Sequence, residues 1–467
     1  MEDKAPEKTP SAELPPSEQT QPADQTQPSK PKSGGSGISF ALILIGIGAV
    51  FLLNNMGLIS ISWAQAARFW PLLLIIIGLD IIVGRRSALG GALVGLATVG
   101  AIAGVIWFSQ GPNAPTVSGN TITGKIHVPL EGAKRLKVVV DIGDLPLTLD
   151  AETDEKEVMV HGEYKSNSWS EPQVDYEMDG DLGTVTIKQP RASGMPFDFT
   201  EERYLHLHLP EGIPTELEVN SDLGQTTVDL TGLEITNLDV EAGSGQLNVT
   251  LPQQAEMDNL RVKADLGQVN VIAPDGAELT TRSFDVNSGS GQLNVTLPES
   301  GSLGEVHIEG DLGQVTVSAQ SGGHVEMEKF TVKSGSGQLT VELPPDSDLG
   351  EVDIEGDLGQ VQVEIPNIDS VTVSSFRVKS GSGAMSVVLP NTGQYEAEIE
   401  SDLGAVEVEI PDGLEASLQF ELGLGKVNIE NGRLTQFGEN AWRTDDTGAD
   451  NSVQLTINGG SGAITIK

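Results

Sequence analysis

An eleven-residue phrase occurs three times in this chain, at intervals of 46 residues. It reads AGSGQLNVTLP at 242–252, SGSGQLNVTLP at 288–298 and SGSGQLTVELP at 334–344. A related phrase, DLGQ, falls between the copies, and aligning both phrases on their Gly-Gln pair gives one register with steps of 21 to 24 residues. Fixed periods of this length are the signature of stacked structural repeats. We therefore expect two similar coils in each 46-residue repeat.

Each coil has the same internal order of strand, glycine corner and strand. After the glutamine, apolar residues stand at alternate positions, as at Leu293, Val295 and Leu297. Alternate residues of a strand share one face, and one coil alone cannot bury that face. Coils stacked about 4.8 Å apart would bury it together. The sequence therefore predicts an all-β β-solenoid, with coils of about 23 residues over 216–467 and an amino-terminal β part over 121–215.

Glycine and glutamine recur at the corner of each coil, and both are predicted to be structural. A tight corner favours positive φ, which glycine adopts at the lowest cost. Glutamines at one coil position would stack, so that their amides could hydrogen-bond along the axis as a ladder. The predicted corner glycines are Gly224, Gly245, Gly267, Gly291, Gly313, Gly337, Gly359, Gly383 and Gly404. The predicted ladder glutamines are Gln225, Gln246, Gln268, Gln292, Gln314, Gln338 and Gln360.

Three apolar segments precede the repeats. Residues 38–59 and 88–108 are each long enough to cross a bilayer, which takes about 20 apolar residues. The middle segment, at about 66–84, is shorter and contains Asp80, which we expect to pair in the interfacial region with the arginines that follow it. The sequence predicts an α-helical transmembrane region of three spans over 38–110. A disordered Pro/Gln-rich tail at 1–37 would precede it, and a linker at 111–120 would follow it.

Positive charges beside the apolar segments predict the orientation in the membrane. Arg85 and Arg86 lie in the second short loop, and Lys30 and Lys32 precede the first segment. Since basic residues favour the cytoplasmic side, the amino terminus is expected inside. Three spans then place the carboxyl-terminal domain outside a multi-pass cell-membrane protein. If the middle segment does not span, that domain is cytoplasmic.

The acidic charge is concentrated in the solenoid. Residues 1–110 carry equal numbers of acidic and basic residues, so the net charge of −40 falls on residues 111–467. Such a surface disfavours nucleic acid as a partner and is compatible with a cationic peptide, an envelope protein or a cell-wall component. It would also keep a large β surface soluble. The chain contains no cysteine, which excludes disulfides and thiolate chemistry.

The sequence contains no recognisable catalytic motif. GSGQ lies between strands, with no helix amino terminus to receive a phosphate, and no Gly-x-Ser-x-Gly elbow is present. His206 and His208 share a strand face, but the sequence offers them no third metal ligand. The repeated aspartates stand two coils apart and do not match a calcium-binding repeat. We predict a non-enzymatic protein with no catalytic residue, cofactor or metal; the rival is a glycan-active β-helical enzyme.

Two parts of the chain resemble bacterial families. ALILIGIGAVFLLNNMGLI at 41–59 and RFWPLLLIIIGLDIIVG at 68–84 resemble the transmembrane region of LiaI/LiaF-type proteins. LKVVVDIGDLPLTL at 136–149, the segment 205–252 and the coils after it resemble the toast-rack, or adhesin-type (DUF4097-like), β-solenoids. The resemblance implies a bacterial envelope protein.

The resemblance also implies a function. LiaF-type relatives act as membrane inhibitors or modulators of a histidine-kinase pathway that responds to cell-wall damage. The expectation is therefore a membrane-anchored solenoid that acts as an envelope-stress sensor or modulator and binds a partner in the cell envelope. The alternative is an adhesin or surface scaffold protein.

Overall fold

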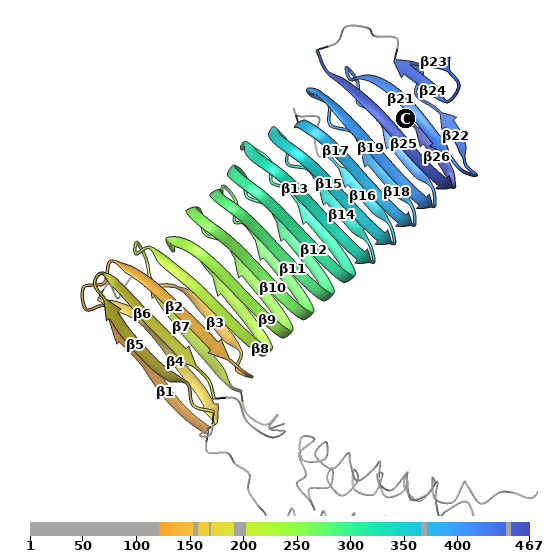
Figure 1. Cartoon of the computed structure of the whole chain (residues 1–467). Coiled ribbons are helices and arrows are strands. Elements are labelled where there is room, and N and C mark those ends of the chain that lie inside the picture. The colour runs from red at the N-terminus through yellow and green to blue at the C-terminus, as the bar shows by residue number, and fades with distance from the viewer. Residues whose placement is uncertain (1–120, 153–156, 168–169, 191–201, 366–370, 445–449) are drawn as a thin grey trace, which may run out of the picture. The chain divides into compact units, whose positions relative to one another are not determined.

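The computed structural model describes residues 121–152, 157–167, 170–190, 202–365, 371–444 and 450–467. All 26 elements in these ranges are β-strands, and they join one continuous hydrogen-bonded sheet. Successive strands lie side by side in a long stack of rungs (Figure 1). The predicted all-β solenoid is confirmed. The predicted tail, three spans and linker lie outside the described residues, and among those residues no helix is long and apolar enough for a membrane span.

The regular coils begin with five long strands that pair in parallel, each with the next. They are β8 (Thr215–Asp229), β9 (Ile235–Thr250), β10 (Gln254–Ile272), β11 (Glu278–Thr296) and β12 (Ser300–Ser318). Each runs through the glycine corner without a break. The first half of a coil therefore builds one wall, which we call the first wall, and the second half builds the second wall. The buried side chains of both walls form one core between them.

The later coils keep this register, although the corner now divides each coil into two strands. The first-wall strands are β13 (Val325–Ser336), β15 (Ser347–Leu358), β17 (Val371–Ser382) and β19 (Gln394–Leu403). Their second-wall partners are β14 (Leu339–Glu342), β16 (Val361–Glu364), β18 (Met385–Val388) and β20 (Val406–Glu409).

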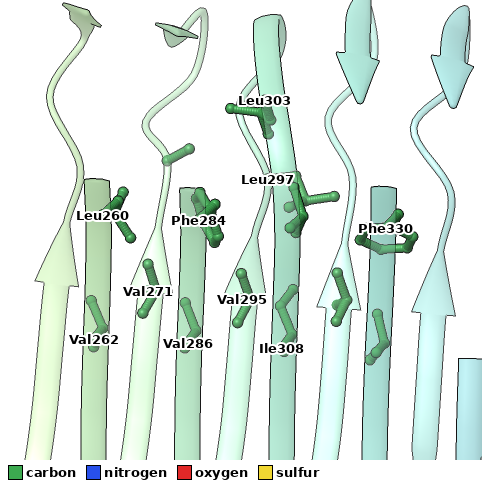
Figure 2. Packing of buried hydrophobic residues seen from close by; sticks show 14 of the residues in the cluster. Leu260, Val262, Val271, Phe284, Val286, Val295, Leu297, Leu303, Ile308 and Phe330 are labelled. Atoms are coloured by element: carbon green, nitrogen blue, oxygen red, sulfur yellow. The ribbon is translucent and has the colours of Figure 1, made fainter. Parts of the chain in front are cut away.

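Large and small side chains alternate along the core. Phe284, Phe330 and Phe376 are buried on every second coil, and Val306 and Val352 occupy the same position between them. Figure 2 shows Phe284 and Phe330 beside the buried valines and leucines of both walls. Burying one such side chain is worth roughly 1.5–3 kcal/mol. The two-coil repeat seen in the sequence is thus also the packing repeat of the core.

The amino-terminal part uses antiparallel pairs to begin the two walls. The elements on the second-wall side are β1 (Thr121–Pro129), β4 (Val158–Asn167), β7 (Tyr204–Pro210) and β3 (Leu147–Glu152), paired in that order. Those on the first-wall side are β5 (Gln173–Asp179), β6 (Leu182–Lys188) and β2 (Arg135–Ile142). β8 then pairs with β2 through its first half and with β3 through its second half. Both walls therefore continue directly into the coils.

At the carboxyl end, the order of the stack departs from the order of the chain. β25 (Ser452–Ser461) pairs with both β19 and β21 (Glu415–Leu422), and β26 (Ala463–Ile466) pairs with both β20 and β22 (Lys426–Ile429). The last two strands in the sequence, β25 and β26, therefore do not end the stack. They lie one coil before its end, between β19 and β20 on one side and β21 and β22 on the other. The outer edge of β21 is covered by β24 (Ala441–Thr444), which forms an antiparallel pair with β23 (Leu434–Gly438).

Candidate binding surface

The predicted corner glycines lie in one column, and all nine have positive φ, from 119° to 145°. Gly313, with φ of 129°, shows why the position is restricted. A Cβ atom there would stand 1.7 Å from the carbonyl oxygen of Gly291 in the preceding coil. Any side chain would therefore collide with backbone that the parallel pairing holds in place. The corner requires glycine for its close approach as well as for its φ.

The predicted glutamines share the next register position, as the pairing of Gln225 with Gln246 and of Gln268 with Gln292 illustrates. Gln246 and Gln268 donate hydrogen bonds, each 3.3 Å long, to the asparagine two residues further along their own strand. Direct bonding between the glutamine amides stays a prediction.

An asparagine ladder, which sequence reasoning missed, lies two residues beyond the glutamines. Asn270 donates to Asn248 at 2.7 Å, and Asn294 donates to Asn270 at 2.8 Å. The signal was present in three consecutive coils as the phrases QLNV, QVNV and QLNV. Stacked amides of this kind bond from coil to coil along the axis.

Leucine and serine alternate at an exposed position just before the corner glycine, and an exposed aspartate precedes each leucine of the repeats. The leucines are Leu223, Leu266, Leu312, Leu358 and Leu403, each 54–57% exposed. The preceding aspartates are Asp222, Asp265, Asp311, Asp357 and Asp402. We call these ten residues the Asp–Leu corner. In the register, each leucine faces a serine of the neighbouring coil, so that leucines recur about every 9.6 Å, twice the strand spacing.

The alternation continues through the inserted carboxyl-terminal coil. Leu403 pairs with Ser461 of β25. Beyond it, Leu424 takes the next leucine position, because its neighbours Leu422 and Lys426 pair with Gly459 and Ala463. Leu424 is 88% exposed. The spacing of leucines is therefore a property of the surface rather than of the chain order.

The first wall carries ion pairs that run from coil to coil. Glu355 lies between Lys333 at 3.4 Å and Lys379 at 3.6 Å. Arg261 likewise contacts Asp239 at 3.7 Å and Glu241 at 3.3 Å. Many of the basic residues of the solenoid form such pairs, which partly neutralise the negative charge of the first wall. The Asp–Leu corner lies at its border, where the acids are exposed to solvent.

A pocket of about 280 Å³ lies where the Asp–Leu corner meets the first wall on β2, β8, β9 and β10. Asp222, Glu241 and Asp265 line it together with Asp141, and Lys263 is the basic residue among its lining. Clefts lined by one sign of charge concentrate ions of the opposite sign. The pocket therefore favours a cationic group.

The two histidines of YLHLHLP lie on β7 with their side chains on the solvent side. His206 lies opposite Glu163 in the register, and its ring contacts that of Tyr204, with 4.6 Å between the ring centroids. His208 instead lies opposite His161 of β4, and the two rings stack with their centroids 4.8 Å apart. The two histidines therefore have different surroundings, and His208 has a partner, His161, that the sequence did not suggest.

Taken together, the fold and its surface define an acidic β-solenoid with an exposed, regularly spaced row of leucines. Family models match three parts of the chain. Residues 38–82 match the LiaI-LiaF-like transmembrane region, residues 117–272 the N-terminal domain of toast_rack (DUF2154), and residues 272–467 the toastrack DUF4097 domain. The resemblance noted from the sequence is confirmed: the chain carries a LiaI-LiaF-like transmembrane region followed by two toast-rack domains, and these matches support a membrane-anchored β-solenoid.

Three solved structures contain chains that are similar to this one. A putative cell adhesion protein from Clostridium sporogenes is 17% identical, with 74% of this chain and 99% of that chain covered and a TM-score of 0.21. A putative lipid binding protein from Parabacteroides distasonis is 12% identical, with 75% and 98% covered and a TM-score of 0.27. A putative adhesin from Parabacteroides merdae is 12% identical, with 75% and 98% covered and a TM-score of 0.24. The comparison with curated proteins finds no match.

Proposed function

We propose that this chain is a non-enzymatic sensor or modulator of envelope stress, of the LiaF type, whose solenoid lies outside the cytoplasmic membrane. The solenoid binds a cationic, amphipathic partner of the cell envelope along the Asp–Leu corner. The observation that carries the proposal is the regular row of exposed leucines, each beside an exposed aspartate. The transmembrane match at residues 38–82 supports its attachment to the membrane.

The corner has two chemical properties that a partner must satisfy together. Its carboxylates attract positive charge, and this attraction weakens as salt screens it. Its leucines offer apolar area, worth roughly 25 cal/mol for each Å² removed from water. The glycine and serine of the intervening coils leave space between the leucines. A partner with apolar side chains at regular intervals and basic side chains beside them fits both properties.

The spacing of the leucines favours one type of secondary structure in the partner. Leucines recur about every 9.6 Å along the corner. An α-helix returns to nearly the same face every seven residues, which is about 10.5 Å. An amphipathic helix lying along the solenoid would therefore meet one leucine in each heptad over several coils. A β-strand, with a two-residue repeat of about 6.8 Å, would not keep this register.

The first experiment tests on which side of the membrane the solenoid lies. Gln338 is exposed at a corner, and the chain has no native cysteine. Gln338→Cys in intact cells should react with a membrane-impermeant maleimide as fully as it does after lysis. Reaction only after lysis would place the solenoid in the cytoplasm, and an envelope sensor facing outward would be excluded.

The second experiment tests the Asp–Leu corner itself. Full-length protein in detergent micelles is titrated with a synthetic basic amphipathic helix that has leucine once in each heptad. Leu312→Ser combined with Leu358→Ser should weaken binding about tenfold or more, because two apolar contacts are lost. Ile272→Ser is the matched control, since Ile272 is a 45% exposed apolar residue that lies away from the corner.

The dependence on salt completes the test. Binding to the unmodified chain should weaken as salt rises, and Asp311→Asn combined with Asp357→Asn should reduce that dependence. Equal binding by the corner variants and the control would exclude the corner as the binding surface. If deleting residues 121–467 changes cell attachment and leaves the response to cell-wall antibiotics intact, an adhesin or surface scaffold replaces the proposed role.

A further inference from the structure

Four adjacent strands place three histidines and an aspartate in one row on the solvent side of the amino-terminal wall. His127 of β1 lies opposite His161 of β4, which lies opposite His208 of β7, and His208 in turn lies opposite Asp150 of β3. Glu152 stands two residues beyond Asp150, so both carboxylates are on the same side of β3. Chain segments distant in sequence thus deliver imidazoles and carboxylates to one place.

Within this row, Glu152, His161 and His208 form a compact group. One ligand atom from each residue lies within 4.8 Å of the others. Nε2 of His161 faces Oε2 of Glu152, and Nδ1 of His208 faces Oδ1 of Asp150. All of these side chains are half-buried, with that of His161 only 19% exposed. The group is therefore partly shielded from water and still open to an entering ion.

The core holds the group in position. Val160 precedes His161, Leu207 precedes His208 and Leu149 precedes Asp150, and all three apolar residues are completely buried. Because neighbours in a strand point to opposite sides, these anchors fix the direction in which the polar residues point. The antiparallel pairing of β4 and β7 then fixes the distance between the two imidazoles.

We propose that Glu152, His161 and His208 form a binding site for a divalent transition metal, with Zn²⁺ as the ion that they fit best. Two imidazoles and one carboxylate are a donor set that Zn²⁺ takes in proteins, with a fourth position left for water or another ligand. Asp150 holds the ring of His208 as an outer partner, which orients the imidazole for the metal. The net charge of −40 favours the entry of a cation.

A second group, His324, Glu326 and Asp348, also places its ligand atoms within 4.8 Å of one another, but all three of its residues are exposed. Its ion pairs are longer, at 3.6–3.8 Å. It provides an internal control for loose surface binding. His206 provides another, because it lies on the same strand and the same side as His208.

The site is tested on the full-length protein in detergent micelles by equilibrium dialysis against Zn²⁺ alone, with bound metal measured by elemental analysis. The unmodified chain, His206→Gln and His324→Gln should each bind one Zn²⁺ with the same affinity. His161→Gln and His208→Gln should each bind about 100-fold more weakly, and Asp150→Asn about 10-fold more weakly. Far-UV circular dichroism checks that each variant keeps its β structure.

Titration with Co²⁺ gives a second readout, since its visible absorption reports the coordination of the metal directly. Co²⁺ should acquire the strong absorption of a tetrahedral or five-coordinate site in the unmodified chain and not in His161→Gln combined with His208→Gln. Failure of the unmodified chain to bind Zn²⁺, equal binding by all variants, or selective loss in His324→Gln would each overturn the proposal.

Discussion

The carbonyl oxygen of Gly291 occupies the space in which Gly313, one coil further along, would carry a side chain. A Cβ atom on Gly313 would stand 1.7 Å from that oxygen, and the same distance recurs between Gly337 and Gly313 and between Gly359 and Gly337. The corner of each coil is therefore built against the backbone of the coil before it. The repeated phrases of the sequence are explained by this contact more directly than by any ligand.

Gly313→Ala should destabilise the solenoid by more than about 3 kcal/mol, because backbone must move in addition to the strain of positive φ. Gly180→Ala is the control, since Gly180 has φ of 65° and no atom within 4 Å of the added Cβ. Its cost should be about 1–2 kcal/mol, from φ alone. Urea denaturation measures both. Equal losses in the two variants would mean that the corner backbone yields easily.

The asparagine ladder should contribute to stability in proportion to its hydrogen bonds. Asn270 both donates to Asn248 and accepts from Asn294, whereas Asn294 has one bond of this ladder. Asn270 also accepts a bond from Gln268, so Asn270→Ala breaks three side-chain hydrogen bonds and Asn294→Ala breaks one. Each bond is worth about 0.5–1.5 kcal/mol, so Asn270→Ala should lose roughly three times as much unfolding free energy as Asn294→Ala. Both variants keep the strand, so urea midpoints compare them directly. A greater loss in Asn294→Ala would contradict the ladder.

The alternating core predicts a large difference between buried and exposed apolar residues. Phe330→Ala should cost about 3–5 kcal/mol, because a completely buried ring leaves a cavity between two valine-bearing coils. Leu312→Ala is the control, since Leu312 is 56% exposed and should cost under about 0.5 kcal/mol. Denaturation followed by circular dichroism measures both variants. A substantial loss in Leu312→Ala would show that the Asp–Leu corner serves stability rather than binding.

Asp239 predicts a pH dependence of stability. Burial raises the pKa of its carboxyl above 3.8, with Glu241 adding to the rise and Arg261 opposing it. The folded state therefore binds this proton more tightly than the unfolded state, and the resulting stability, present below pH 3.8, is lost as pH rises through the folded pKa. Asp239→Asn should be more stable than the unmodified chain at pH 7, with a gain that shrinks as pH falls toward 4.

Asp181 should affect the pH dependence of stability in the opposite direction to Asp239. Its hydrogen bond with Arg135 lowers the pKa of its carboxyl, so its stabilising effect is present above pH 3.8 and lost as pH falls through the folded pKa. Asp181→Asn should therefore be slightly less stable than the unmodified chain at pH 7. Urea denaturation from about pH 2 to pH 8 follows both variants and covers the pH range in which each carboxyl titrates. Parallel pH profiles for the two would refute the assignment.

The sequence predicted the coils well because every coil repeats the same local requirements. The corner glycines and the alternating apolar residues follow from backbone geometry and from strand period, which act within a few residues. The asparagine ladder was also visible but less regular, since threonine replaces asparagine in several coils, as at Thr316 and Thr340.

Features that join distant segments were not predictable in this way. The segments ELGLGKVNIE at 421–430 and NGGSGAITIK at 458–467 both resemble the coil phrase. Nothing in either segment indicates that the later one takes the earlier place in the stack of coils. The histidine group is similar. His161 follows Glu152 by nine residues, but Asp150 and His208 are 58 residues apart and meet only through the pairing of β3 with β7.

The insertion of β25 and β26 sets the order in which the carboxyl end can assemble. Coils up to β20 can be added one after another, each on a finished neighbour. β21 and β22 have no such neighbour until residues 452–466 have entered between them and β19 and β20. This end can therefore close only after the last residues of the chain have docked, and until they do, the open edge of β19 and β20 is exposed to pairing with the strands of other chains.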